Sequence, residues 1–356
     1  MSIFGSLFAA KAPRIVELLP LGTRFEVPAG KTILEAALAA GIVFPHDCTV
    51  GTCGTCKSRL AAGRVNALSE FAYTLSPQEL AANFILPCQS TPRDALVKIE
   101  VAIPPAQAET PQRYEGRIVT SAPMTHDILQ IHVELDRPIH YVAGQYANVG
   151  APGGDRLRSY SFAAPPQREG STHITFCVRK VAGGAFTEAL FADRFAGVVL
   201  QIDGPHGTFH LRDGDGPIVC VAGGSGLPPI LSMLEEAARC AIARPGVLLF
   251  GARTTRDLYA LERISAISAN WAAPFVFLPV LSHEPADSPW TGARGLVTEF
   301  MADALPAVDW AKVQGYLCGP PGMIDVAITS LTDQGAALGS IFYDKFTDAS
   351  HAARMS

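Results

Sequence analysis

The chain has 356 residues, of which 48% are hydrophobic and 17% are charged, and its formal net charge is −5. This length predicts two or three domains, each large enough for a hydrophobic core of its own. The small net charge, without a block of like charges, argues against nucleic acid as a partner. The N-terminal segment lacks the basic region and cleavage site of a signal peptide, and no run of about 18 apolar residues predicts a transmembrane helix.

Short strands and two helices are predicted in the first part of the chain. Strands are expected within residues 13–28, 57–60 and 96–103. Lys31–Ala40 predicts a helix that ends at Gly41, and Ser76 followed by Pro77 predicts the start of a second, short helix.

A cysteine-rich loop, PHDCTVGTCGTC, precedes the strand at residues 57–60. Cys48, Cys53 and Cys56 have the spacing C-x4-C-x2-C, and Cys88 supplies a fourth thiol 32 residues later. This spacing is the plant-type signature of a [2Fe–2S] cluster. A zinc site usually requires a second C-x2-C pair, and a disulfide framework is typical of short secreted chains, so both alternatives are weaker.

The other four cysteines each lie in apolar sequence: Cys177, Cys220, Cys240 and Cys318. We expect them to be buried thiols in a reducing compartment, which predicts a cytoplasmic protein.

The order of two strands, helix, cluster loop and further strands resembles the β-grasp fold of plant-type ferredoxins over residues 12–103. Residues 1–105 contain 9 Lys+Arg and 8 Asp+Glu, which gives 9 − 8 = +1. Plant ferredoxins are strongly acidic, so this chain departs from the resemblance, and a large acidic docking face is not expected. Pro104–Gln112 is a linker by composition.

Strands dominate the next hundred residues and predict a small six-stranded antiparallel β-barrel, interrupted by one helical segment at 184–195. These strands are expected at residues 114–121, 128–135, 147–150, 159–162, 173–179 and 198–202.

From Pro217 onward, strands alternate with helices, which predicts a doubly wound parallel α/β sheet. Its strands are expected at residues 218–222, 247–250, 275–280 and 314–317, and its helices at 228–243, 258–269 and 323–332. The expected domains are therefore residues 1–105, 113–212 and 213–356, with a linker at 106–112.

The segment Arg158-Ser159-Tyr160-Ser161 resembles the flavin motif of the ferredoxin–NADP reductase superfamily. The resemblance implies that Arg158 pairs with the flavin pyrophosphate, Tyr160 packs on the isoalloxazine ring and Ser161 hydrogen-bonds near its N5 atom. A guanidinium group forks onto phosphate oxygens, and an aromatic face excludes water, so the chemistry agrees.

The segment VRKVAGGAFT follows in the barrel. Gly183 and Gly184 open a helix whose unpaired N–H groups favour phosphate, and Thr187 adds a hydroxyl donor. The resemblance assigns this segment, with Val178 and Lys180, to the same pyrophosphate. A strand-to-helix turn that simply requires glycine is the alternative.

The segment VAGGSGLPP predicts a strand, a glycine loop and a helix. It departs from the G-x-G-x-x-G fingerprint because Pro229 occupies the third glycine position. Gly223, Gly224 and Gly226 still allow a pyrophosphate to approach the backbone at a helix N-terminus.

The segment YLCGPPGM resembles the superfamily's C-G-P-x-x-M turn through Cys318, Gly319, Pro320 and Met323. The resemblance implies that Cys318 lies beside the nicotinamide and acts with Ser161 at the reacting rings. The alternative is a small buried residue at a strand end.

Near the C-terminus, Phe346 and the residues before it have two equal interpretations. They cover the second face of the flavin, or they form a final strand of the parallel sheet.

The order of ferredoxin, flavin barrel and nicotinamide domain resembles the reductase components of bacterial multicomponent oxygenases, such as those of benzoate dioxygenase, methane monooxygenase and phenol hydroxylase. This resemblance implies a monomer that passes electrons from NAD(P)H through FAD and a [2Fe–2S] cluster to a ferredoxin or directly to the oxygenase of an aromatic-ring oxygenase system. Two alternatives remain open: a reductase for radical deoxygenation of a nucleotide-linked sugar, and a non-enzymatic redox sensor.

The coenzyme preference depends on the end of the second parallel strand, where an acid would face the adenosine ribose and repel a 2′-phosphate. Here the nearest acid, Asp257, is predicted to lie at the start of a helix beside Leu258. Arg253 would meet a phosphate or stack on adenine. The resemblance favours NADH, and the missing acid predicts that NADPH is rejected only by roughly 100-fold or less.

Overall fold

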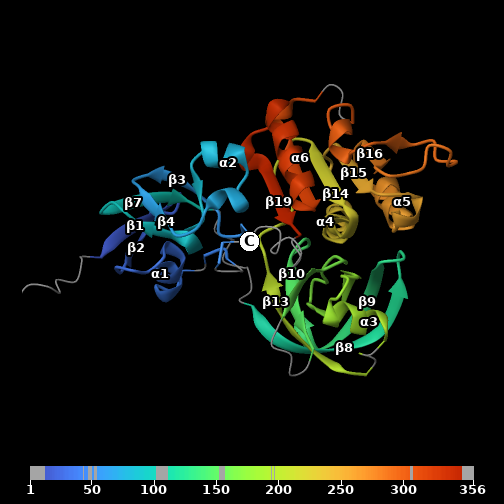
Figure 1. Ribbon diagram of the computed structural model, residues 1–356, viewed down its shortest axis with the longest axis horizontal. Coiled ribbons are helices and arrows are strands. Elements are labelled where there is room, and N and C mark those ends of the chain that lie inside the picture. Colours follow the sequence, from blue (N-terminus) through green and yellow to red (C-terminus); the bar gives the residue numbers. More distant parts are fainter. Residues whose placement is uncertain are drawn as a thin grey trace, which may run out of the picture. The chain divides into compact units, whose positions relative to one another are not determined.

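The computed structural model describes residues 13–42, 44–46, 50–51, 54–101, 111–151, 157–193, 195, 197–304 and 308–346. The chain divides into two compact units, Met1–Gln107 (unit 1) and Ala108–Ser356 (unit 2), which are shown in Figure 1. Most of the predicted linker lies outside the described residues, and its last residue, Gln112, is the first residue of strand β8. No helix in the described ranges is long and apolar enough to cross a membrane.

Unit 1 is built on a mixed sheet in which β1 pairs antiparallel with β2 and parallel with β7. The strand order is β2 (Thr23–Val27), β1 (Arg14–Leu19), β7 (Leu96–Glu100), β3 (Ser58–Ala62) and β5 (Phe84–Ile85). A separate short ladder joins β4 (Val65–Ala67) to β6 (Ser90–Pro92).

The helices of unit 1 are α1 (Ile33–Ala39) and α2 (Pro77–Ala81). Two helical turns, η1 (Phe71–Tyr73) and η2 (Pro87–Gln89), complete the unit. The apolar face of α1 packs on the sheet through Ile33 and Leu34, which are at most 1% exposed. The predicted β-grasp architecture is confirmed.

Unit 2 begins with an antiparallel sheet that curves into a partly closed barrel. Its strand order is β11 (Arg158–Ser161), β10 (Tyr146–Gly150), β13 (Val199–His206), β8 (Gln112–Pro123), β9 (Ile128–Ile139) and β12 (Ser171–Arg179). An isolated bridge between Phe162 and Phe176 brings the two edges of this sheet together. Helix α3 (Ala185–Phe191) follows β12, as predicted, but it is shorter than expected at its C-terminal end.

The second sheet of unit 2 is parallel throughout, in the order β17 (Ala293–Arg294), β16 (Phe275–Leu281), β15 (Gly246–Ala252), β14 (Ile218–Gly223), β18 (Gln314–Gly319) and β19 (Ile341–Lys345). Its helices are α4 (Leu227–Arg239), α5 (Leu261–Asn270) and α6 (Pro321–Asp333). Short turns of 3-10 helix connect them: η3 (Gly224–Gly226), η4 (Thr255–Asp257), η5 (Val297–Phe300), η6 (Trp310–Lys312) and η7 (Leu338–Ser340).

Helices cover both faces of this sheet, because successive residues of a strand point to opposite sides. In β14, Cys220 and Ala222 belong to the core shared with α4 and α5, whereas Val219 and Val221 belong to the core shared with α6. The predicted doubly wound sheet is therefore confirmed. The boundary predicted near residue 212 stays a prediction.

The expectation of four buried thiols outside the cluster loop is wrong for Cys240. Cys220 and Cys318 are at most 1% exposed, but Cys240 caps the C-terminal end of α4 on its outer surface and is exposed. Cys177 is partly exposed. Cys240 lies between the exposed residues Arg239 and Ala241 at the end of α4, so the apolar composition of this segment could not show which way its side chain points.

Both helices of unit 1 begin with a capping box, but the two boxes differ in burial. Glu79 is 1% exposed, accepts the Ser76 N–H at 2.8 Å and binds the Lys57 ammonium at 2.8 Å. Glu35 accepts the Thr32 N–H at 2.9 Å, but its side chain is 51% exposed. The same motif is thus part of a buried ion pair in α2 and a surface cap in α1.

We expect Glu79→Ala to lower the free energy of unfolding of unit 1 by about 3 kcal/mol, because it leaves a partly buried ammonium without its carboxylate. Glu35→Ala, the matched control, should cost about 1 kcal/mol or less. Thermal unfolding of both variants checks this expectation. Equal costs for the two substitutions would contradict a special contribution of the buried pair.

Candidate functional site

The cysteine loop of unit 1 is described only in part, because Cys48 and Cys53 lie outside the described residues. Cys56 and Cys88 are 3% and 4% exposed and belong to the same hydrophobic cluster. Gly51 has a φ of +85°, and a Cβ on it would lie 2.7 Å from Cγ of Gln89. A loop that passes this closely to the residue after Cys88 fits a cluster that both segments bind.

The antiparallel sheet places the predicted flavin residues on one short strand. Arg158, Tyr160 and Ser161 all lie on β11, and the Tyr160 ring stacks 6.1 Å from the ring of Phe186 in α3. The Arg158 guanidinium lies 5.1 Å from the same Phe186 ring. Burial raises the pKa of Tyr160 to about 12, so its phenol stays neutral. A neutral, half-buried aromatic face beside a guanidinium fits a flavin.

The glycine segment after β12 forms the predicted turn, but two of the side chains predicted to bind phosphate here are buried. Thr187 is 4% exposed, and its hydroxyl accepts the Val181 N–H at 3.1 Å, so this group hydrogen-bonds within the turn itself. Val178 is fully buried in the barrel core, which leaves only its backbone for a ligand. The Lys180 ammonium lies 5.6 Å from the ring of Phe191. Contact of these residues with the flavin pyrophosphate stays a prediction.

The glycine loop after β14 meets the end of β18 backbone to backbone. A Cβ on Gly226 would lie 2.2 Å from the Cys318 carbonyl oxygen, so no other residue fits there. Gly223, Pro320 and Met323 line the resulting cleft. The structure therefore brings together two of the predicted nucleotide segments that lie about a hundred residues apart.

Cys318 is fully buried at the end of β18. Burial raises its pKa well above the ordinary range of a thiol, so it stays protonated. It belongs to a hydrophobic cluster that also contains Ile128 and Phe209 of the antiparallel region. Cys318 thus lies where the two halves of unit 2 meet.

The C-terminal strand interpretation is confirmed for Ile341–Lys345, which form β19 beside β18. Phe346 follows directly, and its N–H donates to the Gly319 carbonyl at 2.9 Å. The alternative, that this segment also covers the flavin, stays a prediction for Phe346.

Hydrogen bonds fix the flavin strand against the parallel sheet. The carbonyls that follow β11 accept three of them: Ala163 from Arg263 at 2.8 Å, Ala164 from Ser232 at 2.8 Å, and Pro166 from Arg239 at 3.0 Å. The donors lie on α4 and α5, so the two halves of unit 2 are held in one register.

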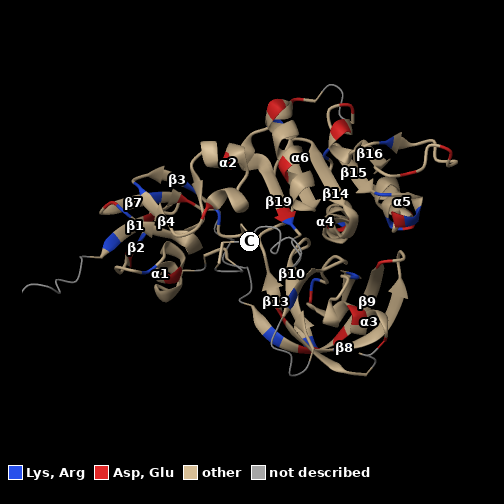
Figure 2. Cartoon of the chain, viewed as in Figure 1, with Lys and Arg blue, Asp and Glu red and all other residues tan. Residues whose placement is uncertain are grey.

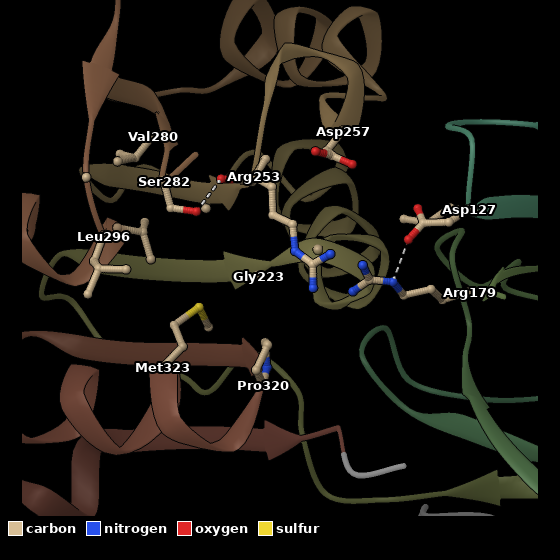
Figure 3. Close-up of a pocket in the computed structure, with 16 residues that line it drawn as sticks. Asp127, Arg179, Gly223, Arg253, Asp257, Val280, Ser282, Leu296, Pro320 and Met323 are labelled. Carbon is tan, nitrogen blue, oxygen red and sulfur yellow. Dashed lines mark hydrogen bonds and ion pairs between the residues drawn. The ribbon is translucent and has the colours of Figure 1, made fainter. Parts of the chain in front are cut away.

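A cavity of about 230 Å³ opens between these halves. It is lined by Asp127, Ile128, Arg179, Gly223, Gly224, Gly251, Ala252, Arg253, Asp257, Val280, Ser282, Gly295, Leu296, Val297, Pro320 and Met323. Four of these side chains are charged, and two of the four come from the antiparallel sheet region. Figure 3 shows how these four point into the cleft.

The guanidinium groups of Arg179 and Arg253 turn toward each other in front of Gly223 (Figure 3). Arg179 Nε donates to Asp127 at 2.8 Å, whereas no residue in the described part of the chain hydrogen-bonds to the Arg253 side chain. Two converging cations over a glycine loop fit a doubly charged anion such as a pyrophosphate.

Sequence reasoning missed Arg179 and Asp127 as site residues. Arg179 stands between the predicted Val178 and Lys180, so its position carried a signal, but nothing in the sequence around Asp127 indicated a role. Asp257 has the predicted helix-start geometry, since its carboxylate accepts the Thr254 N–H at 2.9 Å, and it also lines the cleft.

An acidic side chain does lie near the segment that follows β15, the second parallel strand in sequence, but it belongs to the segment that follows β16. The Glu284 carboxylate, after β16, accepts the Thr255 N–H at 2.7 Å. That backbone hydrogen bond lowers the pKa of Glu284, so the group is ionised. A carboxylate that the sequence analysis did not consider therefore lies close to Thr255, although Glu284 is not among the residues that line the cleft.

Three family models match consecutive parts of the chain. A 2Fe-2S iron-sulfur cluster binding domain matches residues 16–93, an oxidoreductase FAD-binding domain residues 115–211, and an oxidoreductase NAD-binding domain residues 220–328. The structure is similar to the crystal structure of an Amycolatopsis cytochrome P450 reductase, with a TM-score of 0.69 and 31% identity over 94% of this chain and 99% of that chain.

Two relatives match along nearly their full lengths. The xylene/toluene monooxygenase electron transfer component of Pseudomonas putida is 42% identical, over 96% of this chain and 95% of that protein. The reductase component of phenol 2-monooxygenase from Pseudomonas sp. strain CF600 is 34% identical, over 95% of this chain and 96% of that protein. The chain therefore belongs to the family of reductase components of multicomponent oxygenases, electron-transfer oxidoreductases with a [2Fe–2S] domain, an FAD-binding domain and an NAD-binding domain.

Proposed function

We propose that this chain takes electrons from NADH and passes them, through FAD and its [2Fe–2S] cluster, directly to the oxygenase component of an aromatic-hydrocarbon monooxygenase. The observation that carries the proposal is the 42% identity, over 96% of the chain, to an electron transfer component of xylene/toluene monooxygenase. The phenol 2-monooxygenase reductase component adds a second relative whose named substrate is aromatic. These relatives favour an oxygenase partner over a sugar-deoxygenating enzyme or a redox sensor.

The finer parts of the proposal concern location and assembly. We propose that the protein is a cytoplasmic monomer. The buried thiols Cys220 and Cys318 support the cytoplasmic location, because reduced thiols persist in a reducing compartment.

The chain's own residues would hold each group in place. Cys48, Cys53, Cys56 and Cys88 would bind the cluster, and β11 would hold FAD through the groups described above. When bound, FAD accepts two electrons from the coenzyme, and the cluster carries one electron at a time.

The cleft of unit 2 would hold the coenzyme with its pyrophosphate over Gly223 and Gly224, between Arg179 and Arg253. Pro320 and Met323 would border the nicotinamide half. The buried Cys318 would help to exclude water where the two rings meet.

The test is reconstitution of the intact protein with the hydroxylase component of a toluene or phenol monooxygenase. We expect NADH-dependent hydroxylation with the wild type. Cys53→Ser should abolish the visible iron–sulfur absorption and the hydroxylation, while NADH still reduces the flavin, because the cluster and flavin sites lie in separate compact units. Wild-type protein that reduces a dye but couples to no aromatic hydroxylase would contradict the proposed partner.

Cys318→Ala should slow reduction of the flavin by NADH by about tenfold while changing the dissociation constant of NADH by less than about threefold. A side chain that sets the relative orientation of two rings acts mainly in the transition state. Stopped-flow reduction of the flavin measures both quantities.

The matched control for this variant is Cys220→Ala, which removes an equally buried thiol from the neighbouring strand β14. It should leave the limiting rate unchanged. If Cys318→Ala also leaves that rate unchanged, Cys318 only fills space.

The coenzyme preference would depend on Glu284, which carries a fixed negative charge at the ends of β15 and β16. We expect NADH to be favoured, by roughly 100-fold or less in kcat/KM, or under about 2.7 kcal/mol. Glu284→Gln keeps an acceptor for the Thr255 N–H but removes the charge. It should raise kcat/KM for NADPH by about tenfold and leave NADH nearly unchanged.

Arg253→Ala is the comparison variant, and its kcat/KM values for NADH and NADPH are measured at the same ionic strength as those of Glu284→Gln. Because its guanidinium points toward Gly223 (Figure 3), we expect equal losses with NADH and NADPH. A loss confined to NADPH would instead assign Arg253 to the 2′-phosphate, and an unchanged preference in Glu284→Gln would remove Glu284 from coenzyme selection.

A further inference from the structure

We infer that Asp127 is a positioning residue for coenzyme binding, because it holds the Arg179 guanidinium in the orientation that receives the coenzyme pyrophosphate. This inference rests on the proposed function, since it assumes that the cleft of unit 2 takes a nicotinamide coenzyme. It assigns to Asp127 a role that acts through Arg179.

The Asp127 carboxylate has a fixed direction because the turn around it is anchored on several sides. Its Oδ1 accepts the Thr125 hydroxyl at 2.9 Å, and its backbone N–H donates to that hydroxyl oxygen at 3.2 Å. Its own carbonyl accepts the Lys180 N–H at 2.7 Å, which joins the turn to the end of β12. The acceptor for Arg179 is therefore in place before any coenzyme arrives.

Asp127 uses only one edge of the Arg179 guanidinium. Its Oδ2 accepts Arg179 Nε at 2.8 Å, and the described residues offer no hydrogen bond to Nη1 or Nη2. Nη1 lies 3.3 Å from the position that a Cβ on Gly224 would occupy. The planar fork thus presents its free donors to the glycine loop of the opposite sheet, where a phosphate would bind.

Asp127 also offsets an electrostatic problem in the empty cleft. Arg179 and Arg253 face each other (Figure 3), and two like charges in a partly buried site repel. Burial would raise the pKa of Asp127, but the Thr125 hydroxyl and the Arg179 guanidinium together hold that pKa below its ordinary value. An ionised carboxylate therefore keeps Arg179 in the cleft without a bound anion.

Orientation of this kind lowers the entropy lost on binding, because a long Arg side chain otherwise samples many rotamers. The benefit is the same for every coenzyme with a pyrophosphate. It should therefore change the affinity for NADH and NADPH by equal factors and leave the chemical step alone.

The test is stopped-flow reduction of the flavin in the intact, FAD-loaded protein, titrated with NADH and with NADPH. Asp127→Ala should raise the apparent dissociation constant of both coenzymes by about tenfold, and the limiting rate should stay within about twofold of the wild type. Asp127→Asn retains an oxygen that accepts Arg179 Nε but removes the negative charge, so its dissociation constants should lie between those of the wild type and those of Asp127→Ala.

The double variant Asp127→Ala, Arg179→Ala should bind NADH no more weakly than Arg179→Ala alone, because both substitutions remove the same interaction. Arg117→Ala is the control for general loosening of unit 2, since it removes an exposed hydrogen bond to the Gly197 carbonyl outside the cleft. It should leave the dissociation constant unchanged.

Additive losses in the double variant would overturn the inference, and so would equal losses in Asp127→Ala and Asp127→Asn. An unchanged dissociation constant in Asp127→Ala, with wild-type flavin reduced normally by NADH, would contradict this inference alone. Wild-type flavin that NADH does not reduce would contradict the proposed function instead.

Discussion

The carboxyl edge of the parallel sheet must stay free of side chains, and the rest of the coenzyme site depends on that constraint. β14 and β18 end side by side, and a Cβ on Gly319 would lie 2.9 Å from the Gly223 carbonyl oxygen. Such loops let a pyrophosphate reach the backbone, but they carry no side chain that could neutralise it. Cations must therefore come from neighbouring elements, and we propose Arg253 after β15 and Arg179 of β12, which both line the cleft.

Because one of the two proposed cations belongs to the FAD-binding half, the proposal makes coenzyme binding depend on the register between the two halves of unit 2. Hydrogen bonds from Ser232, Arg239 and Arg263 to the carbonyls after β11 fix that register. The same bonds hold the strand that carries Arg158, Tyr160 and Ser161. A single interface within the compact unit 2 thus positions both the predicted flavin residues and the arginines that we propose for the coenzyme.

Local sequence was sufficient for most of the fold, because apolar alternation and helix caps such as Thr32 and Ser76 act within a few residues. It was also sufficient for the glycine loops, whose demand is local backbone geometry. It failed where tertiary contacts decide. Glu284 reaches Thr255 across 29 residues, and Asp127 reaches Arg179 across 52, so neither pair has a sequence pattern. The Thr187 hydroxyl, which the sequence analysis assigned to a ligand, hydrogen-bonds within its own turn, and its contact with the pyrophosphate stays a prediction.

The nearly balanced charge of unit 1 is consistent with its covalent connection to unit 2. Free electron carriers use charged faces to increase their rate of encounter with a partner. Unit 1 has nearly balanced charges, 9 basic against 8 acidic residues in 1–105, and Figure 2 shows both signs interspersed along its strands. A tether gives a second module an effective concentration on the order of millimolar, which makes steering toward unit 2 unnecessary. The surface of unit 1 is therefore released from one electrostatic demand that acts on free electron carriers.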